Sequence, residues 1–135
     1  MKIYLCILFF SLNQVFASNT VSGKGLICNY GSDEDMYEVY LFYEKKYVSK
    51  YLFLEKDTYK IRENEKRNYD ITKNYIELKP FKINKKNFNV IDTEFKKIIG
   101  NCETITTHDK AMEFIQELRN KKQIKVNKFL GREEI

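Results

Sequence analysis

Cysteine is the residue type in this sequence with the most restricted chemistry. The chain has three cysteines, and Cys6 lies in an apolar N-terminal run that we expect to be removed on export. An even pair in an exported chain predicts one disulfide, here between Cys28 and Cys102. It would close a loop of about 75 residues and stabilise the fold by roughly 4 kcal/mol, because it restricts the unfolded chain. A metal site formed by these two cysteines and His108 is the alternative, although no Cys-x-x-Cys spacing supports it.

His108 is the only histidine and the first candidate for a general base. A general base acts on a nucleophile and is oriented by an acid, and no motif supplies either partner. The sequence also lacks Gly-x-Ser-x-Gly, a P-loop and a dinucleotide-binding fingerprint. The acidic segment 31–35 lacks EF-hand spacing, which favours a solvated turn over a calcium site. These observations favour a protein with no catalytic residues, metal or other cofactor. A small hydrolase with two carboxylates is the less favoured alternative.

Tyrosines are concentrated in two neighbouring β-rich segments. The candidates for ligand binding are Tyr37, Tyr40, Tyr43, Tyr47 and Tyr51. An aromatic groove with lysine at its edge suits a sugar, a peptide or a hydrophobic ligand. The alternative, which we favour, is that these rings simply pack in the core and on the half-buried face of a sheet.

The N-terminal segment 1–17 has the order of a secretory signal peptide. Lys2 gives a positive start, Ile3–Phe10 is an unbroken apolar run, and Val15–Ala17 offers residues that signal peptidase tolerates. The run is shorter than the roughly 20 residues that span a bilayer, and no second apolar span follows it. We therefore expect a mature chain without a transmembrane segment, in the periplasm or outside the cell.

The charge of the chain is basic but mixed. Its formal charge is +5, and such a balance is typical of proteins that bind nucleic acid or anionic surfaces. Lysine rather than arginine supplies most of the 24 basic residues, and the 19 acidic residues are spread among them. Lysine shares A/T-rich codons with the plentiful Asn, Ile, Tyr and Phe. These features favour an ordinary mixed-charge surface and no nucleic-acid partner.

Hydrophobic alternation organises residues 18–130 into a single β-rich domain. Segments 22–30, 36–43, 47–54 and 58–63 have the pattern of strands, and shorter strands follow. Aromatics on both faces of two of these segments favour a sheet covered on both sides or curled around an interior. The pattern predicts a mainly β, α+β fold: an antiparallel meander of about 7–9 short strands curled into a small barrel or half-barrel, with one C-terminal helix.

The later segments complete this prediction. The polar segment 64–68 is expected to be a loop. Residues 91–100 fit either a helical turn or a turn and strand, and we favour the strand. A Thr-Thr-His-Asp sequence starts a helix over about 107–122, because threonine caps free amides and Asp109 suits the helix dipole. Residues 131–135 are expected to form a loose charged tail.

A motif near the start of the mature chain carries a resemblance. Gly23–Cys28 reads Gly-Lys-Gly-Leu-Ile-Cys; a signal peptide precedes it, and short strands, the late Cys102 and a terminal helix follow. In this outline the chain resembles small exported proteins of A/T-rich bacterial genomes, and the resemblance implies no activity. We expect a non-catalytic binding or interaction module of the cell envelope, whose partner is an envelope component, a protein or a small ligand. An envelope assembly or structural protein is the second expectation, suggested by the loose charged tail after Leu130.

Overall fold

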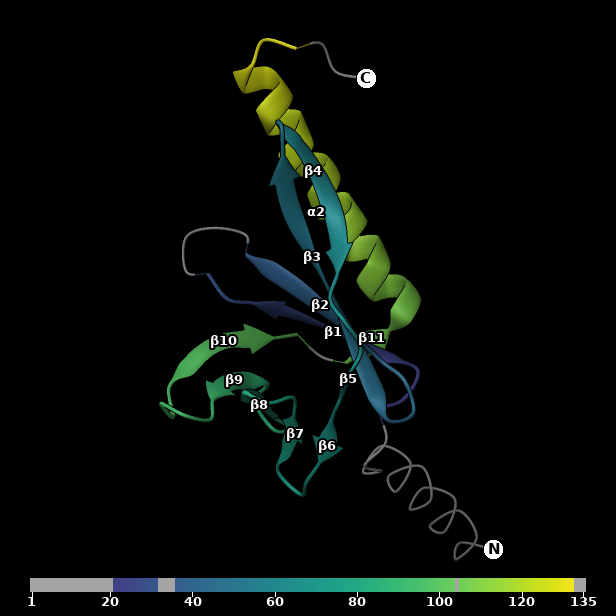
Figure 1. Ribbon diagram of the computed structural model, residues 1–135, viewed down its shortest axis with the longest axis vertical. Coiled ribbons are helices and arrows are strands. Elements are labelled where there is room, and N and C mark those ends of the chain that lie inside the picture. The colour runs from purple at the N-terminus through teal and green to yellow at the C-terminus, as the bar shows by residue number, and fades with distance from the viewer. Residues whose placement is uncertain (1–20, 32–35, 104, 133–135) are drawn as a thin grey trace, which may run out of the picture.

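The computed structural model describes residues 21–31, 36–103 and 105–132 (Figure 1). The predicted signal peptide 1–17, most of the acidic segment 31–35 and the end of the predicted tail lie outside these residues. The described part forms an antiparallel half-barrel with a helix, α2, along one side.

The strands of the described part belong to one antiparallel sheet. They are β1 (Lys24–Asn29), β2 (Tyr37–Phe42), β3 (Lys46–Glu55), β4 (Thr58–Glu63), β5 (Arg67–Asn68), β6 (Asp70–Ile71), β7 (Tyr75–Glu77), β8 (Phe81–Asn84), β9 (Asn89–Asp92), β10 (Ile98–Cys102) and β11 (Thr106–Thr107). Nine of them follow one path, in the order β4-β3-β2-β1-β10-β9-β8-β7-β6. The prediction of an antiparallel meander curled into a half-barrel is confirmed.

The sheet consists of two meanders, an early one of β1 to β4 and a later one of β6 to β10. It curls because these two meanders meet at two places. β1 pairs with β10, and β5 pairs with the first residues of β3, so that the later strands fold back beside the earlier ones. The segment 64–68, predicted to be a loop, therefore contributes a short strand. Alternate side chains fill the curled interior: Val21, Leu26, Cys28, Tyr40, Phe42, Tyr47, Ile76, Leu78, Ile83, Val90 and Cys102.

The opposite face of β1 and β2 packs against α2 (His108–Phe129). Its buried cluster is Ile27, Val39, Leu41, Ala111 and Ile115. Gly25 allows this close approach, because a Cβ there would lie 2.8 Å from the Cβ of Ala111. The strands are thus covered on both faces, as the aromatic pattern predicted.

The helix begins as predicted and ends later than predicted. The Thr107 hydroxyl accepts a hydrogen bond from the Lys110 amide at 3.2 Å, which caps the first turn. The expected end near residue 122 is wrong by about two turns, since α2 continues to Phe129. The reason is tertiary: Gln123 accepts from the Tyr59 amide at 2.7 Å and donates to the Asp57 carbonyl at 3.0 Å. No helix among the described residues is long and apolar enough to cross a bilayer.

Residues 91–100 form a turn and a strand, the alternative that we favoured. The Asp92 carboxylate accepts from the amides of Glu94 and Phe95, each at 2.9 Å, and closes the turn between β9 and β10. These two bonds close a turn where a helix would otherwise begin. The helical spacing of the apolar residues in 91–100 therefore does not produce a helix.

Candidate functional site

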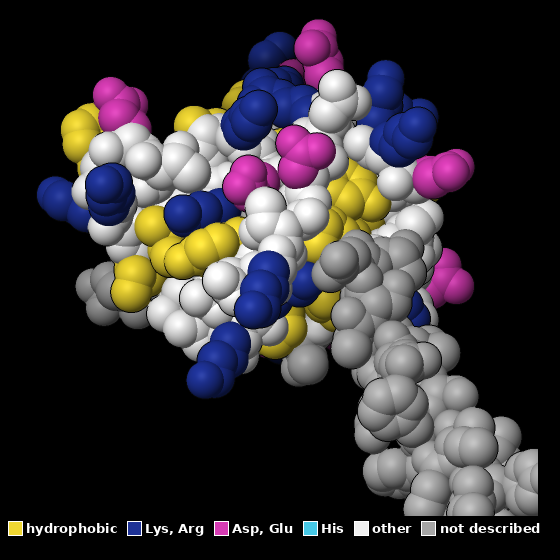
Figure 2. All heavy atoms as spheres, turned by 90° about the horizontal axis from the view of Figure 1, so that it is seen from below, with side chains coloured by type: hydrophobic (Ala, Val, Ile, Leu, Met, Phe, Trp, Pro, Cys, Tyr) yellow, Lys and Arg dark blue, Asp and Glu magenta, His cyan; other side chains and the backbone are white. Residues whose placement is uncertain are grey.

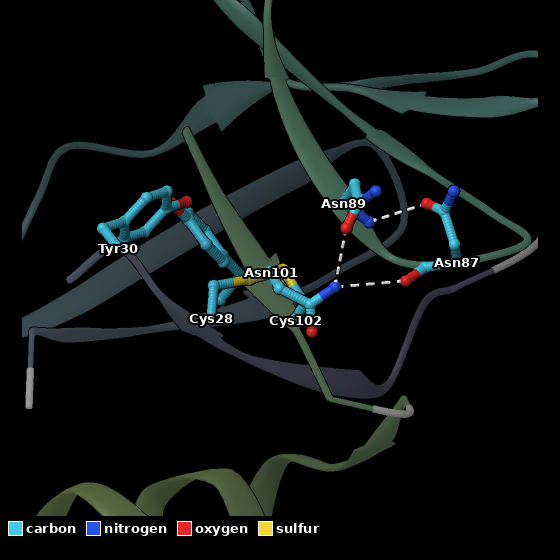
Figure 3. Close-up of a disulfide and its surroundings, with 7 residues drawn as sticks. Cys28, Tyr30, Asn87, Asn89, Asn101 and Cys102 are labelled. Atoms are coloured by element: carbon cyan, nitrogen blue, oxygen red, sulfur yellow. Dashed lines mark hydrogen bonds between the residues drawn. A yellow bond between two sulfur atoms is a disulfide. The ribbon is translucent and has the colours of Figure 1, made fainter. Parts of the chain in front are cut away.

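The predicted disulfide is present at the junction of the two meanders. Cys28 and Cys102 lie directly opposite each other on β1 and β10, with their sulfurs 1.98 Å apart (Figure 3). Both are buried. Beside them the Asn101 side chain donates to the Asn89 side chain at 2.9 Å and to the Asn87 carbonyl at 3.2 Å (Figure 3). Because the bond uses both sulfurs, the alternative metal site with His108 is not formed.

His108 has a structural position at the start of α2. Its Nε2 lies 2.9 Å from the Phe42 carbonyl oxygen, and since a carbonyl only accepts, Nε2 carries the proton. Its ring packs edge-on against Tyr43, with centroids 5.0 Å apart. Within the described part of the chain, no group of three or more His, Cys, Asp or Glu side chains converges on a metal-sized site.

The five candidate tyrosines separate into three groups. Tyr40 and Tyr47 are buried in the half-barrel interior, and the Tyr47 hydroxyl donates to the Leu78 carbonyl at 3.0 Å. Tyr43 lies partly exposed beside His108, where β2 ends. Only Tyr37 and Tyr51 line a common hollow, at the end of the sheet where β2 begins.

That hollow is the candidate site, and we call it the tyrosine hollow. It has a volume of about 440 Å³ and is open to solvent. It forms because β3 and β4 continue past the start of β2 and meet α2 there. Its lining consists of Tyr30, Met36, Tyr37, Glu38, Tyr51, Leu52, Tyr59, Asn64 and Lys122.

Glu38 is the acidic group of the tyrosine hollow. It stands opposite Tyr51 across the β2–β3 ladder and is partly buried. Burial raises the pKa of its carboxyl, and hydrogen bonds from the Ser49 and Tyr40 hydroxyls only partly offset this. The Asn64 amide donates to the buried Ser49 hydroxyl at 2.7 Å and lies 3.5 Å from a Glu38 oxygen. The carboxylate is therefore held in place by its neighbours.

A pair of tyrosine hydroxyls extends this network into the half-barrel. The hydroxyls of Tyr30 and Tyr40 share a hydrogen bond, and Tyr40 is 1% exposed. Burial raises the pKa of both phenols far above the ordinary value, so both remain protonated at neutral pH. Tyr30, which lines the hollow beside Glu38, is thus neutral and is hydrogen-bonded to the buried Tyr40 behind it.

Lys122 is the basic group of the hollow and comes from α2. Its Nζ lies 5.8 Å from the centroid of the Tyr59 ring, within cation–π range. The Tyr59 backbone is held by α2, because its amide donates to Gln123 and its carbonyl accepts from Arg119 at 2.9 Å. The backbone that carries the Tyr59 ring and the helix that carries Lys122 are therefore held together.

Seven of the nine lining residues were not singled out from the sequence: Tyr30, Met36, Glu38, Leu52, Tyr59, Asn64 and Lys122. Tyr59 falls on the inward-facing side of the 58–63 alternation, which was a usable signal. The predicted helix over about 107–122 places Lys122 at its end, and this lysine becomes part of the site because α2 continues along the β3–β4 hairpin.

A second open hollow, of about 500 Å³, lies beside the disulfide between β1 and β10. Ile98 and Ile99 line it and are 65% and 38% exposed. The single charged side chain in its lining is Glu103, which is exposed. The tyrosine hollow is the stronger candidate, because it combines several rings with a partly buried carboxylate and a positioned cation.

The charged side chains on the surface do not form as clear a candidate site as this hollow. On the face shown in Figure 2, Lys and Arg side chains are scattered among hydrophobic patches, with Asp and Glu side chains between them. Comparisons of the chain with protein-family models, with curated proteins and with solved structures give no match, so the site is interpreted from its own geometry.

The lining of the tyrosine hollow is suited to binding. Among the described residues, its lining contains one carboxylate, whereas glycoside hydrolysis ordinarily uses two that flank the scissile bond. The same described lining contains no serine, cysteine or histidine that could serve as an activated nucleophile or its base. What it does offer is ring surface, one acceptor, one amide and one ammonium group.

Proposed function

We propose that this chain is a small exported, non-catalytic binding module of the cell envelope, and that the tyrosine hollow is its ligand site. The observation that carries the proposal is the meeting of four tyrosine rings with Glu38 and Lys122 at one open end of the sheet. Such a mostly apolar concavity with a few fixed polar groups is the usual form of a small-molecule site.

The exported location is supported from two sides. The sequence order of residues 1–17 is that of a signal peptide, and the Cys28–Cys102 bond suits an oxidising compartment. Mass spectrometry of the protein recovered from producing cells tests this directly. We expect loss of a segment of about 17 residues and a mass two hydrogens below that of the reduced chain. A full-length, reduced product would contradict the proposed export.

Binding is tested by amide chemical shifts of the isotope-labelled protein. The probes are neutral ring compounds at millimolar concentration: methyl galactoside, methyl glucoside, phenol and benzyl alcohol. We expect at least one to shift amides of Tyr37, Tyr51 and Tyr59 together, because their side chains line one hollow. Tyr51→Ala should weaken that binding, while Tyr43→Ala, at the other end of β2, should not. Shifts that ignore Tyr51→Ala would contradict the proposed site.

A second candidate function is an assembly or structural role in the envelope. One observation favours it: apolar side chains are exposed where α2 ends beside the β3–β4 hairpin, namely Leu54, Ile124, Phe129 and Leu130. Phe129 is 90% exposed. Light scattering over a concentration series tests this role, with Phe129→Ser as the variant. Self-association that Phe129→Ser abolishes would support assembly, and a monomer at all concentrations would argue against self-assembly through this patch.

A further inference from the structure

We infer that the tyrosine hollow selects a ring-bearing organic anion, which stacks on its tyrosines and directs its negative group toward Lys122. This inference rests on the proposed binding role and specifies the class of ligand. The shared chemistry is a six-membered ring that carries a carboxylate, and such a ring can come from an aromatic acid or from a uronic acid.

The ring requirement follows from the walls. Tyr30, Tyr37, Tyr51 and Tyr59 arrive from the end of β1 and from three different strands, and they line one open space. Two of the rings are fixed by neighbours: Tyr37 packs edge-on against Phe114 with centroids 4.9 Å apart, and Tyr30 shares its hydroxyl bond with Tyr40. Preorganised rings lose little entropy when a flat ligand face stacks on them.

The charge requirement follows from Lys122. This side chain is partly buried, and no carboxylate of the described residues forms an ion pair with it. The acids of the adjacent hairpin have partners already: Glu63 pairs with Lys50 at 3.1 Å, and Glu55 pairs with Arg62 at 3.2 Å. An ammonium group that is positioned over Tyr59 but not neutralised attracts a ligand anion.

The helix around Lys122 has the same sign of charge. The segment 119–128 contains basic residues and no acidic residue: the basic ones are Arg119, Lys121, Lys122, Lys125 and Lys128. Lys122 is the residue of this stretch that lines the hollow, and the other basic residues lie near it on the same helix. A segment of one sign raises the local concentration of an oppositely charged ligand.

Glu38 sets the orientation rather than opposing the anion. It comes from β2 and lies beside Ser49 and Asn64, whereas Lys122 comes from α2. A ligand hydroxyl can donate to Glu38 while the carboxylate of the same ligand meets Lys122. The favoured ligand therefore carries a hydroxyl on the ring and its negative charge on the other side.

A series that changes only the charge of the ligand tests the inference. The probes are 4-hydroxyphenylacetate, its neutral amide and the amine tyramine, titrated separately into the labelled protein at low salt. We expect the acid to bind at least about fivefold more tightly than the amide, because a charge-assisted bond is added. Tyramine should bind most weakly of the three.

Matched variants assign the effect to one lysine. Lys122→Gln should bring the ratio of acid affinity to amide affinity close to one, and this ratio, rather than either affinity alone, is the readout. Lys125→Gln removes the same charge from an exposed position of the same helix and should preserve most of the preference. A second arm compares galacturonate with galactose. The ligand class, aromatic acid or uronic acid, is the one whose acid loses more affinity when Lys122 is replaced by Gln.

The outcomes separate this inference from the proposed function. If the amide or tyramine binds as tightly as 4-hydroxyphenylacetate, and galactose binds as tightly as galacturonate, the charge preference is overturned while binding at the hollow stands. If Lys122→Gln and Lys125→Gln weaken the acid equally, the positioned ammonium is overturned as its cause. If the charged series and the neutral compounds all leave the lining amides unshifted, both the inference and the binding role are overturned.

Discussion

The Cys28–Cys102 bond links β1 to β10, the pair of strands that connects the two halves of the described sheet along its main path. It closes a loop with a sequence separation of 74 residues. We expect Cys28→Ala/Cys102→Ala to lose about 4 kcal/mol of unfolding free energy, because its unfolded chain is less restricted. Urea unfolding measures the loss, and the wild-type protein with reductant should show a similar one. A loss below about 1 kcal/mol in both would contradict this role of the bond.

Glu38 makes the stability of the protein depend on pH. Burial raises the pKa of its carboxyl above the ordinary value of 4.5, so the folded state keeps the proton to higher pH than the unfolded chain. The stability that this proton contributes is present below the unfolded pKa and is lost as pH rises through the folded pKa. Glu38→Gln cannot ionise and should therefore match the wild type in acid and be more stable at neutral pH.

Urea unfolding of both proteins between about pH 4 and pH 8 measures this difference. Glu117→Gln, at an exposed position on α2, is the control and should follow the wild type throughout. If the wild type and Glu38→Gln keep a constant difference over the whole range, the carboxyl does not titrate in the expected way.

Single residues were predictable where their chemistry leaves few choices. Two cysteines lie outside the apolar N-terminal run and allow one bond between them, and that bond is present. The tyrosine pattern could identify faces of a strand but not positions along it. Tyr37 and Tyr43 fall on the same face of the predicted strand, yet Tyr37 lines the hollow and Tyr43 lies beside His108, where β2 ends. That difference depends on where β2 begins relative to β3.

At the scale of elements, α2 is stabilised along its second half by the β3–β4 hairpin. Gln123 contacts the backbone of both Asp57 and Tyr59. We expect Gln123→Ala to cost about 1–2 kcal/mol and to speed amide exchange over residues 124–129, since those turns lose their attachment. Lys121→Ala, at an exposed position next to the same turn, is the control. Equal exchange in the two variants would mean that the last turns hold by helix propensity alone.

The elements themselves followed local rules at most positions. The predicted strand 58–63 coincides with β4, and the helix start coincides with the Thr107 cap. The exceptions are places where a distant contact decides the outcome. The polar segment 64–68 becomes partly extended because β3 pairs with Arg67–Asn68, and α2 is longer because of Gln123. No local pattern carries that information.

At the scale of the whole molecule, β1 and β2 serve two cores at once. Leu26 and Tyr40 point into the half-barrel, while Ile27 and Val39 pack under α2. The tyrosine hollow lies where these two layers diverge, beyond the start of β2. It could not be located from the sequence, because it depends on how far one layer extends past the other.

Shared strands should make the two layers unfold together. We expect Ile83→Ala in the half-barrel and Ile115→Ala under α2 each to cost about 2–5 kcal/mol, because both side chains are fully buried. In each variant the near-UV signal of the buried tyrosines and the far-UV signal of the helix should lose amplitude at the same urea concentration. Ile98→Ala, at a 65% exposed position, should change stability by less than about 0.5 kcal/mol.

If Ile115→Ala shifts the helix signal and leaves the tyrosine signal in place, the layers are independent. A single shared transition would mean that a ligand in the tyrosine hollow, which touches β2, β3, β4 and α2 together, stabilises the whole protein rather than one layer.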